Sequence, residues 1–295
     1  MHRLTCVVAL ALVLVLVGAA PGLAQPRRCA QHMVVGTYAL AVQGSTLMTL
    51  PGQSLPASLP FASLAIVSID GEGVMTGIGK AALAGRVGES VVSGHIHVNA
   101  DCTADVTTGV GTASTDVIVD NGEELIGLMI EFPAGKPALM GTARRISRAP
   151  LSVDGPCRPH RPHGLYAVSY QGSYMIPLPG VPQPVPMPAL MIGLVSVEHS
   201  GHVTGHGTAS ITGQSMPYDI VDGQLDMDEG CTAVVEMKVD SGGIVDTGKS
   251  WMVSFRDGDE FWAIQTESHT VLPVVAGKWK RVSFGGEHEG GSDRY

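Results

Sequence analysis

The stretch Gly94–Val106, GHIHVNADCTADV, brings two histidines and a cysteine close together in the chain. His95 and His97 are two residues apart, so on a β-strand both imidazoles would point to the same face and could share a metal ion. Cys102 would place a thiol nearby. The same residues also fit a half-buried strand with solvated or barrel-lining histidines, which runs into a disulfide-bonded cysteine. Both interpretations are open at this point.

A second group of histidines, in HSGHVTGH, consists of His199, His202 and His206. His202 and His206 would share one strand face, and His199 would lie across a turn, so three imidazoles could surround zinc or nickel. The polar tip of a hairpin explains the same residues without a metal. The chain carries no GxSxG, HExxH, Walker or Rossmann motif, so we expect no cofactor and favour a protein that is not an enzyme.

The chain aligns with itself at a register of 128 residues. Cys29–Gly52 matches Cys157–Gly180 without a gap, and GHIHVNADCTADV meets GQLDMDEGCTAVV after a one-residue insertion. The second copy keeps the cysteine of that stretch but neither histidine. Residues that recur in both copies include the pairs Tyr38/Tyr166, Gln43/Gln171, Thr76/Thr204 and Arg145/Arg281. The pattern indicates a tandem duplication of one domain of about 120 residues.

The duplication favours one of the three ways to pair the four cysteines that follow the leader. Each copy could form a bridge of its own, Cys29–Cys102 in the first and Cys157–Cys231 in the second, each closing a loop of about 70 residues. A catalytic or metal-bound thiolate is the alternative. It would leave the partner cysteine unexplained in both copies.

The N-terminus has the three parts of a secretory signal. Arg3 precedes the apolar run Cys6–Ala20, and Gly22 and Ala24 are the small residues before a cleavage site. A transmembrane helix is the alternative, but the run is shorter than the ~20 residues that span a bilayer. We therefore expect a secreted or periplasmic protein with no integral membrane segment after cleavage. The net charge of −9 disfavours nucleic acid as a partner.

Composition and periodicity predict an all-β protein. The chain has 38 glycines, 19 prolines and only 15% charged residues, and no segment shows a helical period with caps. Strands are predicted in the first copy at Val34–Gln43, Phe61–Ile69, Val74–Leu83, Ser90–Asn99, Thr103–Gly109, Ser114–Asp120, Glu124–Phe132 and Leu139–Ser147. Eight strands joined by short turns predict an up-and-down antiparallel barrel, with a sandwich as the alternative.

The predicted organisation is a cleaved signal peptide followed by two tandem, roughly eight-stranded barrels. The limits are a signal peptide at 1–24, barrel domains at 25–148 and 157–284, a linker at 149–156 and a disordered tail at 285–295. Thr49–Pro60 and Pro177–Pro188 are predicted loops, because proline lacks the N–H that a strand ladder needs. They are either stiff spacers or rims over a barrel mouth, where Ser173–Pro179 would face a ligand.

Three segments carry a resemblance to a known family. With GTYALAVQG, VSIDGEGVMTG and HVNADCTADV, the chain resembles exported bacterial domains that have a GTY strand, a DGxG hairpin and a VNxDCT segment. Those domains in turn resemble allene oxide cyclase-type barrels, which are related to dirigent proteins and broadly similar to lipocalins. The resemblance implies a small antiparallel barrel with an apolar lumen. The second copy departs from it with MDEGCT, and no catalytic residue of the cyclase type maps onto this chain.

These observations favour a secreted, non-catalytic barrel protein that binds a small apolar ligand or an extracellular partner. A cofactor-independent cyclase or isomerase is one alternative, and a structural or adhesive envelope protein is another. Residues expected to face a ligand, with ordinary core packing as their alternative role, are Tyr38, Tyr166, Tyr170, Met129 and Trp262.

Overall fold

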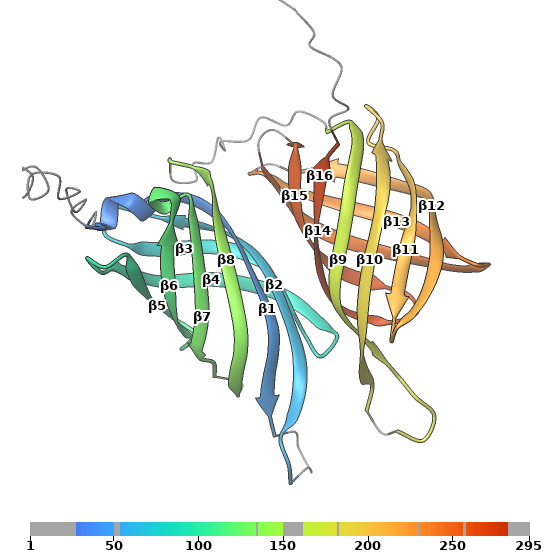
Figure 1. The fold of residues 1–295 in the computed structure, drawn as a ribbon, viewed down its shortest axis with the longest axis horizontal. Coiled ribbons are helices and arrows are strands. Elements are labelled where there is room, and N and C mark those ends of the chain that lie inside the picture. Colours follow the sequence, from blue (N-terminus) through green and yellow to red (C-terminus); the bar gives the residue numbers. More distant parts are fainter. Residues whose placement is uncertain are drawn as a thin grey trace, which may run out of the picture.

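The chain folds into two closed antiparallel barrels of eight strands each (Figure 1). The computed structural model describes residues 28–49, 54–133, 135–149, 162–181, 183–228, 230–255 and 258–282. Strand β1 pairs with β8 in barrel 1, and β9 pairs with β16 in barrel 2. The predicted tandem barrels are confirmed, and the sandwich is excluded because each sheet closes on itself. The predicted signal peptide and tail lie outside the described residues, as does the linker apart from Ala149.

Every predicted strand of the first copy is present. Barrel 1 consists of β1(Gly36–Met48), β2(Ala57–Ile69), β3(Val74–Leu83), β4(Arg86–Val98), β5(Thr103–Thr108), β6(Ala113–Val119), β7(Glu124–Glu131) and β8(Lys136–Ser147). Barrel 2 consists of β9(Gly164–Ile176), β10(Val185–Val197), β11(Val203–Ile211), β12(Gln214–Met227), β13(Thr232–Ser241), β14(Ile244–Phe255), β15(Glu260–Ser268) and β16(Leu272–Arg281).

Barrel 1 also has two short 3₁₀ helices, η1(Gln31–Val34) and η2(Asp120–Gly122). They lie at the same end of the barrel, where η1 contacts both β4 and η2. In the described parts of the chain, no helix has the length and apolarity needed to cross a bilayer.

The turns follow from local chemistry. In the predicted DGEG turn, Asp70 Oδ1 accepts hydrogen bonds from the backbone N–H groups of Glu72 (2.9 Å) and Val74 (2.8 Å). Gly73 adopts a φ of 84°, which L-residues rarely tolerate. Asn121 and Gly122 likewise have positive φ values in the predicted DNGE turn. Both predicted hairpin turns therefore stand where expected.

The two proline-rich connections are shorter than predicted, because strands extend into them. β2 already includes Pro60, and β10 includes Pro186 and Pro188. The ladder between β10 and β11 begins only at Ala189, so the preceding prolines pair with β9 alone. The carbonyl of Pro188 points toward the β11 side, where it accepts the N–H of Thr212. Since the N and C=O of one strand residue point the same way, the missing N–H costs no ladder bond.

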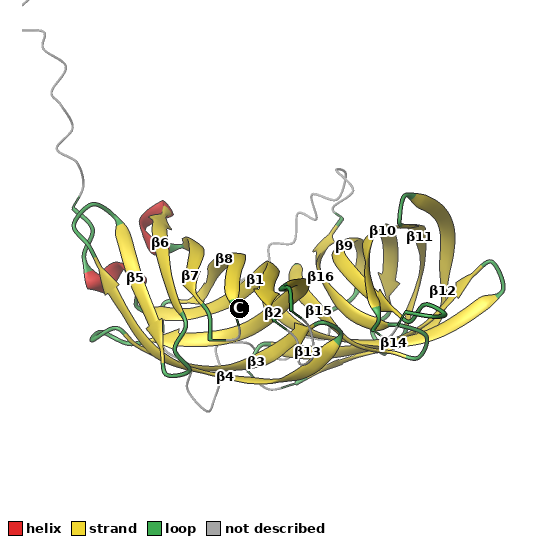
Figure 2. Cartoon of the chain, turned by 90° about the horizontal axis from the view of Figure 1, so that it is seen from below, coloured by secondary structure: helices red, strands yellow, loops and turns green. Residues whose placement is uncertain are grey.

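The two barrels lie side by side (Figure 2). Apolar side chains on their outer faces pack against each other between the barrels. Strand β2 of barrel 1 contacts β14, β15, β16 and β9 of barrel 2. Arg144 forms an ion pair across this junction with Glu260 (2.7 Å), and Gln171 donates a hydrogen bond to Gln43 (3.1 Å). The apolar side chains buried between the barrels include Ala39, Ala62, Leu64, Ile66, Trp251, Val253, Trp262, Ile264 and Ala276.

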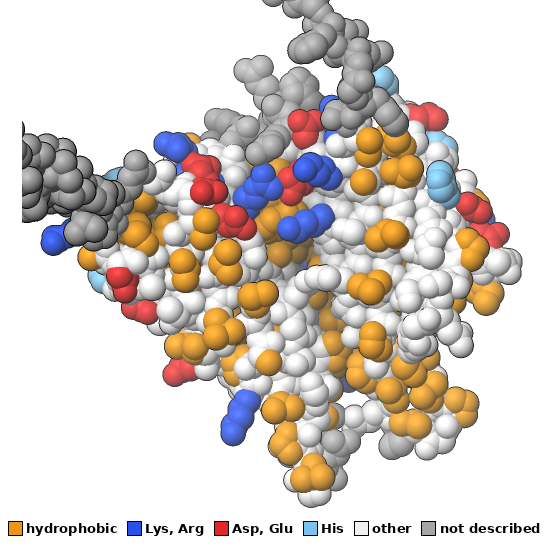
Figure 3. All heavy atoms as spheres, viewed as in Figure 1, with side chains coloured by type: hydrophobic (Ala, Val, Ile, Leu, Met, Phe, Trp, Pro, Cys, Tyr) orange, Lys and Arg blue, Asp and Glu red, His pale blue; other side chains and the backbone are white. Residues whose placement is uncertain are grey.

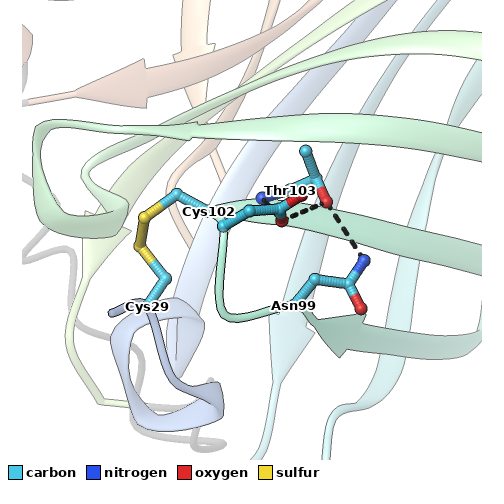
Figure 4. Close-up of a disulfide and its surroundings, with 5 residues drawn as sticks. Cys29, Asn99, Cys102 and Thr103 are labelled. Atoms are coloured by element: carbon cyan, nitrogen blue, oxygen red, sulfur yellow. Dashed lines mark hydrogen bonds between the residues drawn. A yellow bond between two sulfur atoms is a disulfide. The ribbon is translucent and has the colours of Figure 1, made fainter. Parts of the chain in front are cut away.

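The predicted Cys29–Cys102 disulfide is confirmed (Figure 4). It ties the segment before η1 to the turn between β4 and β5. Within that turn Asn99 donates a side-chain hydrogen bond to Thr103 Oγ1 (3.1 Å). Cys231 is disulfide-bonded too. Its predicted partner Cys157 lies outside the described residues, so that pairing stays a prediction.

We expect the double substitution Cys29→Ser/Cys102→Ser to lower the free energy of unfolding of barrel 1 by about 4 kcal/mol. The bridge closes a loop with a sequence separation of 73 residues, and opening it returns that chain entropy to the unfolded state. Urea denaturation followed by circular dichroism measures the change. An unchanged unfolding midpoint would contradict a stabilising role for the bridge.

Candidate binding cavities inside the barrels

Each barrel encloses a cavity, of about 300 Å³ in barrel 1 and about 250 Å³ in barrel 2. An eight-stranded barrel is just wide enough either to be filled by its own side chains or to hold one small ligand. Side chains alternate between the two faces of a strand, so every second residue of a strand lines the cavity. On β1, Tyr38, Leu40 and Val42 face the cavity, whereas Ala39 faces the neighbouring barrel. The two cavities are the strongest candidate binding sites in the described structure.

A buried arginine closes one end of the barrel 1 cavity. The hydroxyl of Tyr38 donates to the carbonyl of Gly122 (2.7 Å) and accepts a bond from Arg145 Nε (3.0 Å). Arg145 also donates to the carbonyl of Met33 and pairs with Glu123 (2.9 Å). Burial raises the pKa of the Tyr38 hydroxyl, and the nearby Arg145 only partly offsets this rise. The end of the barrel next to η1 and η2 is therefore sealed by polar groups that bond to one another.

Barrel 2 repeats this closure with the equivalent residues. Tyr166 donates to the carbonyl of Gly258 (2.7 Å), and Arg281 donates to the Tyr166 hydroxyl (3.2 Å) while pairing with Asp259 (3.2 Å). The pairs Tyr38/Tyr166 and Arg145/Arg281 thus recur in the sequence because these residues pack the same end of each barrel.

The wall of the barrel 1 cavity is apolar apart from a few hydroxyls and one carboxyl group. Asp116 on β6 lines the cavity and is only 9% exposed. Its Oδ1 accepts a hydrogen bond from Ser114 (2.7 Å). The cross-strand neighbour Gly127 leaves room for the carboxyl group, because a Cβ there would collide with Oδ1. Within the described residues, no second hydrogen bond and no cation satisfies the carboxyl group.

Burial disfavours the charged form of Asp116. Desolvation raises the pKa of this carboxyl group, and the hydrogen bond from Ser114 opposes the rise without cancelling it. Burying a carboxylate that lacks a cationic partner is costly. Asp116 therefore reduces the stability of the barrel unless something in the cavity compensates.

Barrel 2 shows that the fold does not require this carboxyl group. Register places Met252 and Ala263 where barrel 1 has Asp116 and Gly127. The barrel 2 cavity is instead narrowed by Tyr170, Tyr174, Tyr218 and Trp279, where barrel 1 has Val42, Thr46, Ser90 and Ala143.

The polar atoms of these aromatic side chains have hydrogen-bond partners inside barrel 2. Trp279 Nε1 donates to the Tyr170 hydroxyl (3.0 Å), and Tyr174 donates to Gln265 (3.1 Å). Burial raises the pKa of all three tyrosines, that of Tyr218 to about 12. The polar groups of barrel 2 are thus largely satisfied by the protein itself, whereas the carboxyl group of barrel 1 is not.

The five residues that were expected to face a ligand lie in different parts of the structure. Tyr38 and Met129 line the barrel 1 cavity, and Tyr170 lines that of barrel 2. Tyr166 is fully buried in the sealed end of barrel 2. The expectation for Trp262 is wrong, because alternation turns its neighbour Phe261 inward and places Trp262 in the junction between the barrels. Sequence reasoning missed Asp116, although it precedes Ile118 by two residues on a predicted strand.

The histidines do not converge on one point. His95 and His97 lie on the exposed outer face of β4, on either side of the buried Ile96. His199 stacks on His163 with ring centroids 3.9 Å apart. His202 lies between Glu198 (3.7 Å) and Asp222 (3.3 Å).

Across the described ranges, no group of three or more histidine, cysteine, aspartate or glutamate side chains could hold a metal ion. The zinc or nickel site predicted at His199, His202 and His206 therefore has no support in this geometry.

Comparison with known proteins gives no assignment. No family model and no curated protein matches the chain. Among solved structures it is similar to a porin-like protein from Bacteroides uniformis, with 9% sequence identity over 84% of this chain and 96% of that chain and a TM-score of 0.18. A likeness of this extent supports no conclusion about function.

Replacing Arg145 by alanine should lower the free energy of unfolding by about 3 kcal/mol, since it removes the donor to the carbonyl of Met33 and the hydrogen bonds that the Tyr38 hydroxyl accepts. Arg148→Ala is the matched control. Arg148 bonds to the same glutamate but is 81% exposed, so its loss should cost no more than about 0.5 kcal/mol. Chemical denaturation of both variants measures the difference, and equal effects would rule out a sealing role for Arg145.

The stability of the protein should depend on the protonation of Asp116. Its pKa in the folded state lies above the ordinary value of 3.8, so folding favours the protonated form. The stability that this form provides is complete below pH 3.8 and is lost as the pH rises through the folded pKa. Asp116→Asn should therefore gain stability relative to the wild type as the pH rises through the folded pKa of Asp116. Denaturation curves of both proteins across this pH range provide the check. A difference in unfolding free energy that stays constant with pH would contradict the prediction.

Proposed function

We propose that the protein binds a small, largely apolar molecule inside barrel 1 and holds it through a hydrogen-bond donor that meets Asp116. The observation that carries this proposal is the buried carboxyl group in the wall of an otherwise apolar cavity of about 300 Å³. A ligand hydroxyl or amine would supply the second partner that the described side chains do not. Apolar walls with a few placed polar groups are typical of small-molecule sites.

The contrast between the barrels supports placing the ligand in barrel 1. Both copies have the same strands and the same sealed end, so the fold alone does not explain a buried acid in one of them. Where barrel 1 has Asp116, barrel 2 has the apolar Met252, which packs into its core. A residue that lowers the stability of one copy, at a position where the other copy folds without it, is a candidate for a functional role.

The setting fits an exported binding protein. Disulfides persist in oxidising compartments, and Cys29 and Cys102 form one here. Secretion and the relation to allene oxide cyclase-like barrels remain part of the proposal, because they rest on the sequence.

Two matched probes test the role of Asp116. 2-Phenylethanol carries a hydroxyl that ethylbenzene lacks, and both are small enough for the cavity. We expect the wild type to bind 2-phenylethanol about tenfold more tightly, the value of one good hydrogen bond to a charged or buried acceptor. Asp116→Leu should lose this preference and bind ethylbenzene at least as tightly as 2-phenylethanol, because the buried hydroxyl then lacks its partner. Chemical-shift perturbation in NMR titrations measures the affinities and shows which barrel responds.

Met252→Leu in barrel 2 is the control, and it should leave the preference for 2-phenylethanol intact. The proposal fails if neither probe shifts resonances of the barrel 1 cavity. It also fails if Asp116→Leu keeps the preference for the hydroxyl.

A second candidate is a cofactor-independent isomerase, favoured by the raised pKa of Asp116, since a carboxyl group of this kind can both give and accept a proton. Native mass spectrometry of protein from its own host would show a retained molecule in either case. Incubating the extracted molecule with fresh protein separates the two functions. A binder returns it unchanged, whereas an isomerase returns a compound of equal mass with a different retention time.

A further inference from the structure

The two barrels of one chain meet through two different faces, although they are copies of one domain. Barrel 1 contributes the β2 face, formed by Ala62, Leu64 and Ile66 on β2. Barrel 2 contributes the β15 face, formed by Val253, Trp262, Ile264 and Ala276 on β14, β15 and β16. All of these side chains are buried. Because the faces differ, the junction uses only one of the two faces that each copy of the domain possesses.

The β2 face has a counterpart on barrel 2 that the chain leaves open. Strand pairing places Leu190, Ile192 and Leu194 of β10 at the positions of Ala62, Leu64 and Ile66. We name these three residues the β10 face. All three are exposed, Ile192 by 65%. The β10 face thus keeps the apolar residue types of the buried β2 face, although its own three side chains are exposed in the described chain.

The β15 face likewise has an open counterpart on barrel 1. Val117, Ile126, Leu128 and Met140 occupy the positions of Val253, Trp262, Ile264 and Ala276. We name these four residues the β7 face. All four are exposed, Met140 by 63%.

The charges beside the junction are also duplicated. Arg144 of barrel 1 pairs with Glu260 of barrel 2. Their counterparts are Lys280, which is the cross-strand neighbour of Glu260, and Glu124, which is the cross-strand neighbour of Arg144. Lys280 and Glu124 retain the signs needed for an equivalent pair. Neither forms a salt bridge within the described part of the chain.

Apolar side chains are not a general feature of the outer walls. The outer face of β11 carries Thr204, His206 and Thr208, and that of β5 carries Asp105 and Thr107. Figure 3 shows hydrophobic side chains on the front of both barrels, on either side of the charged groups near the junction. Exposed apolar patches of this kind usually mark interaction sites.

We propose that copies of this chain associate head to tail, with the β10 face of one copy packed on the β7 face of the next. Each new contact matches the apolar faces of the junction inside the chain, with Lys280 of one copy beside Glu124 of the other, while the Gln43–Gln171 hydrogen bond stays within each chain. The β2 and β7 faces lie on different strands of barrel 1, and the β15 and β10 faces lie on different strands of barrel 2. Leu190 and Ile192 of the β10 face border the groove beside the internal junction, so the next copy would sit next to barrel 1 of the same chain. A contact between unlike faces continues into a ring if the rotation closes and into a filament if it does not.

Sedimentation velocity and native mass spectrometry over a range of concentrations test this proposal. The wild type should form dimers and larger species as its concentration rises. Ile192→Asp disrupts contacts through the β10 face, and Leu128→Asp disrupts contacts through the β7 face, because each substitution would place an unpaired carboxylate in the buried contact. Each variant alone should be monomeric, with a dissociation constant raised on the order of a hundredfold.

Mixing the two variants gives the most specific result. The intact β10 face of Leu128→Asp can still meet the intact β7 face of Ile192→Asp, so an equimolar mixture should form a dimer and nothing larger. Val221→Asp is the matched control, since Val221 is an exposed valine on β12 outside all four faces. It should assemble as the wild type does. Unchanged unfolding midpoints would show that the variants still fold.

Three outcomes would overturn the proposal. The first is a wild type that stays monomeric at every concentration. The second is assembly of either single variant, which would indicate a contact between like faces. The third is a mixture of the two variants that yields only monomers.

Discussion

Closure of each sheet into an eight-stranded barrel is the constraint on which the rest of the structure depends. Because β1 pairs with β8 and β9 with β16, every strand residue faces either the lumen or the outside, and no edge remains in the described sheets. The lumen of such a barrel is narrow, so a few side chains decide whether it is filled or open. In barrel 2 four aromatic rings narrow it. In barrel 1 small residues at the same positions leave space beside the carboxyl group of Asp116.

Duplication separates what the fold requires from what one copy adds. Both barrels keep the tyrosine and arginine that seal one end, and both keep the apolar faces on either side of β1 or β9. They differ in the interior, where barrel 1 has Asp116 and barrel 2 has Met252 at the equivalent position. Because the two copies share one fold, each copy shows which features of the other the fold does not require.

Much of the fold could be predicted from the sequence, because alternation and turn residues act locally. The eight strands, both hairpin turns and the Cys29–Cys102 bridge follow from such patterns. The extension of β10 through Pro186 and Pro188 could not be predicted, since it depends on where the neighbouring strand ends. Trp262 was expected to face the lumen because its size suggests a core residue. Its position in the junction depends on the packing of a second barrel, which no local pattern encodes.

Asp116 was within reach of sequence reasoning, because it lies within the predicted strand Ser114–Asp120. It shares the inward face with Ile118, and an acid on that face must lie among apolar groups. An apolar residue on an outward position is unremarkable alone, but Leu190, Ile192 and Leu194 recur at positions whose counterparts are buried. Since a junction between unlike faces always leaves one of each uncovered, the internal contact of this chain itself creates the surfaces through which further copies can join.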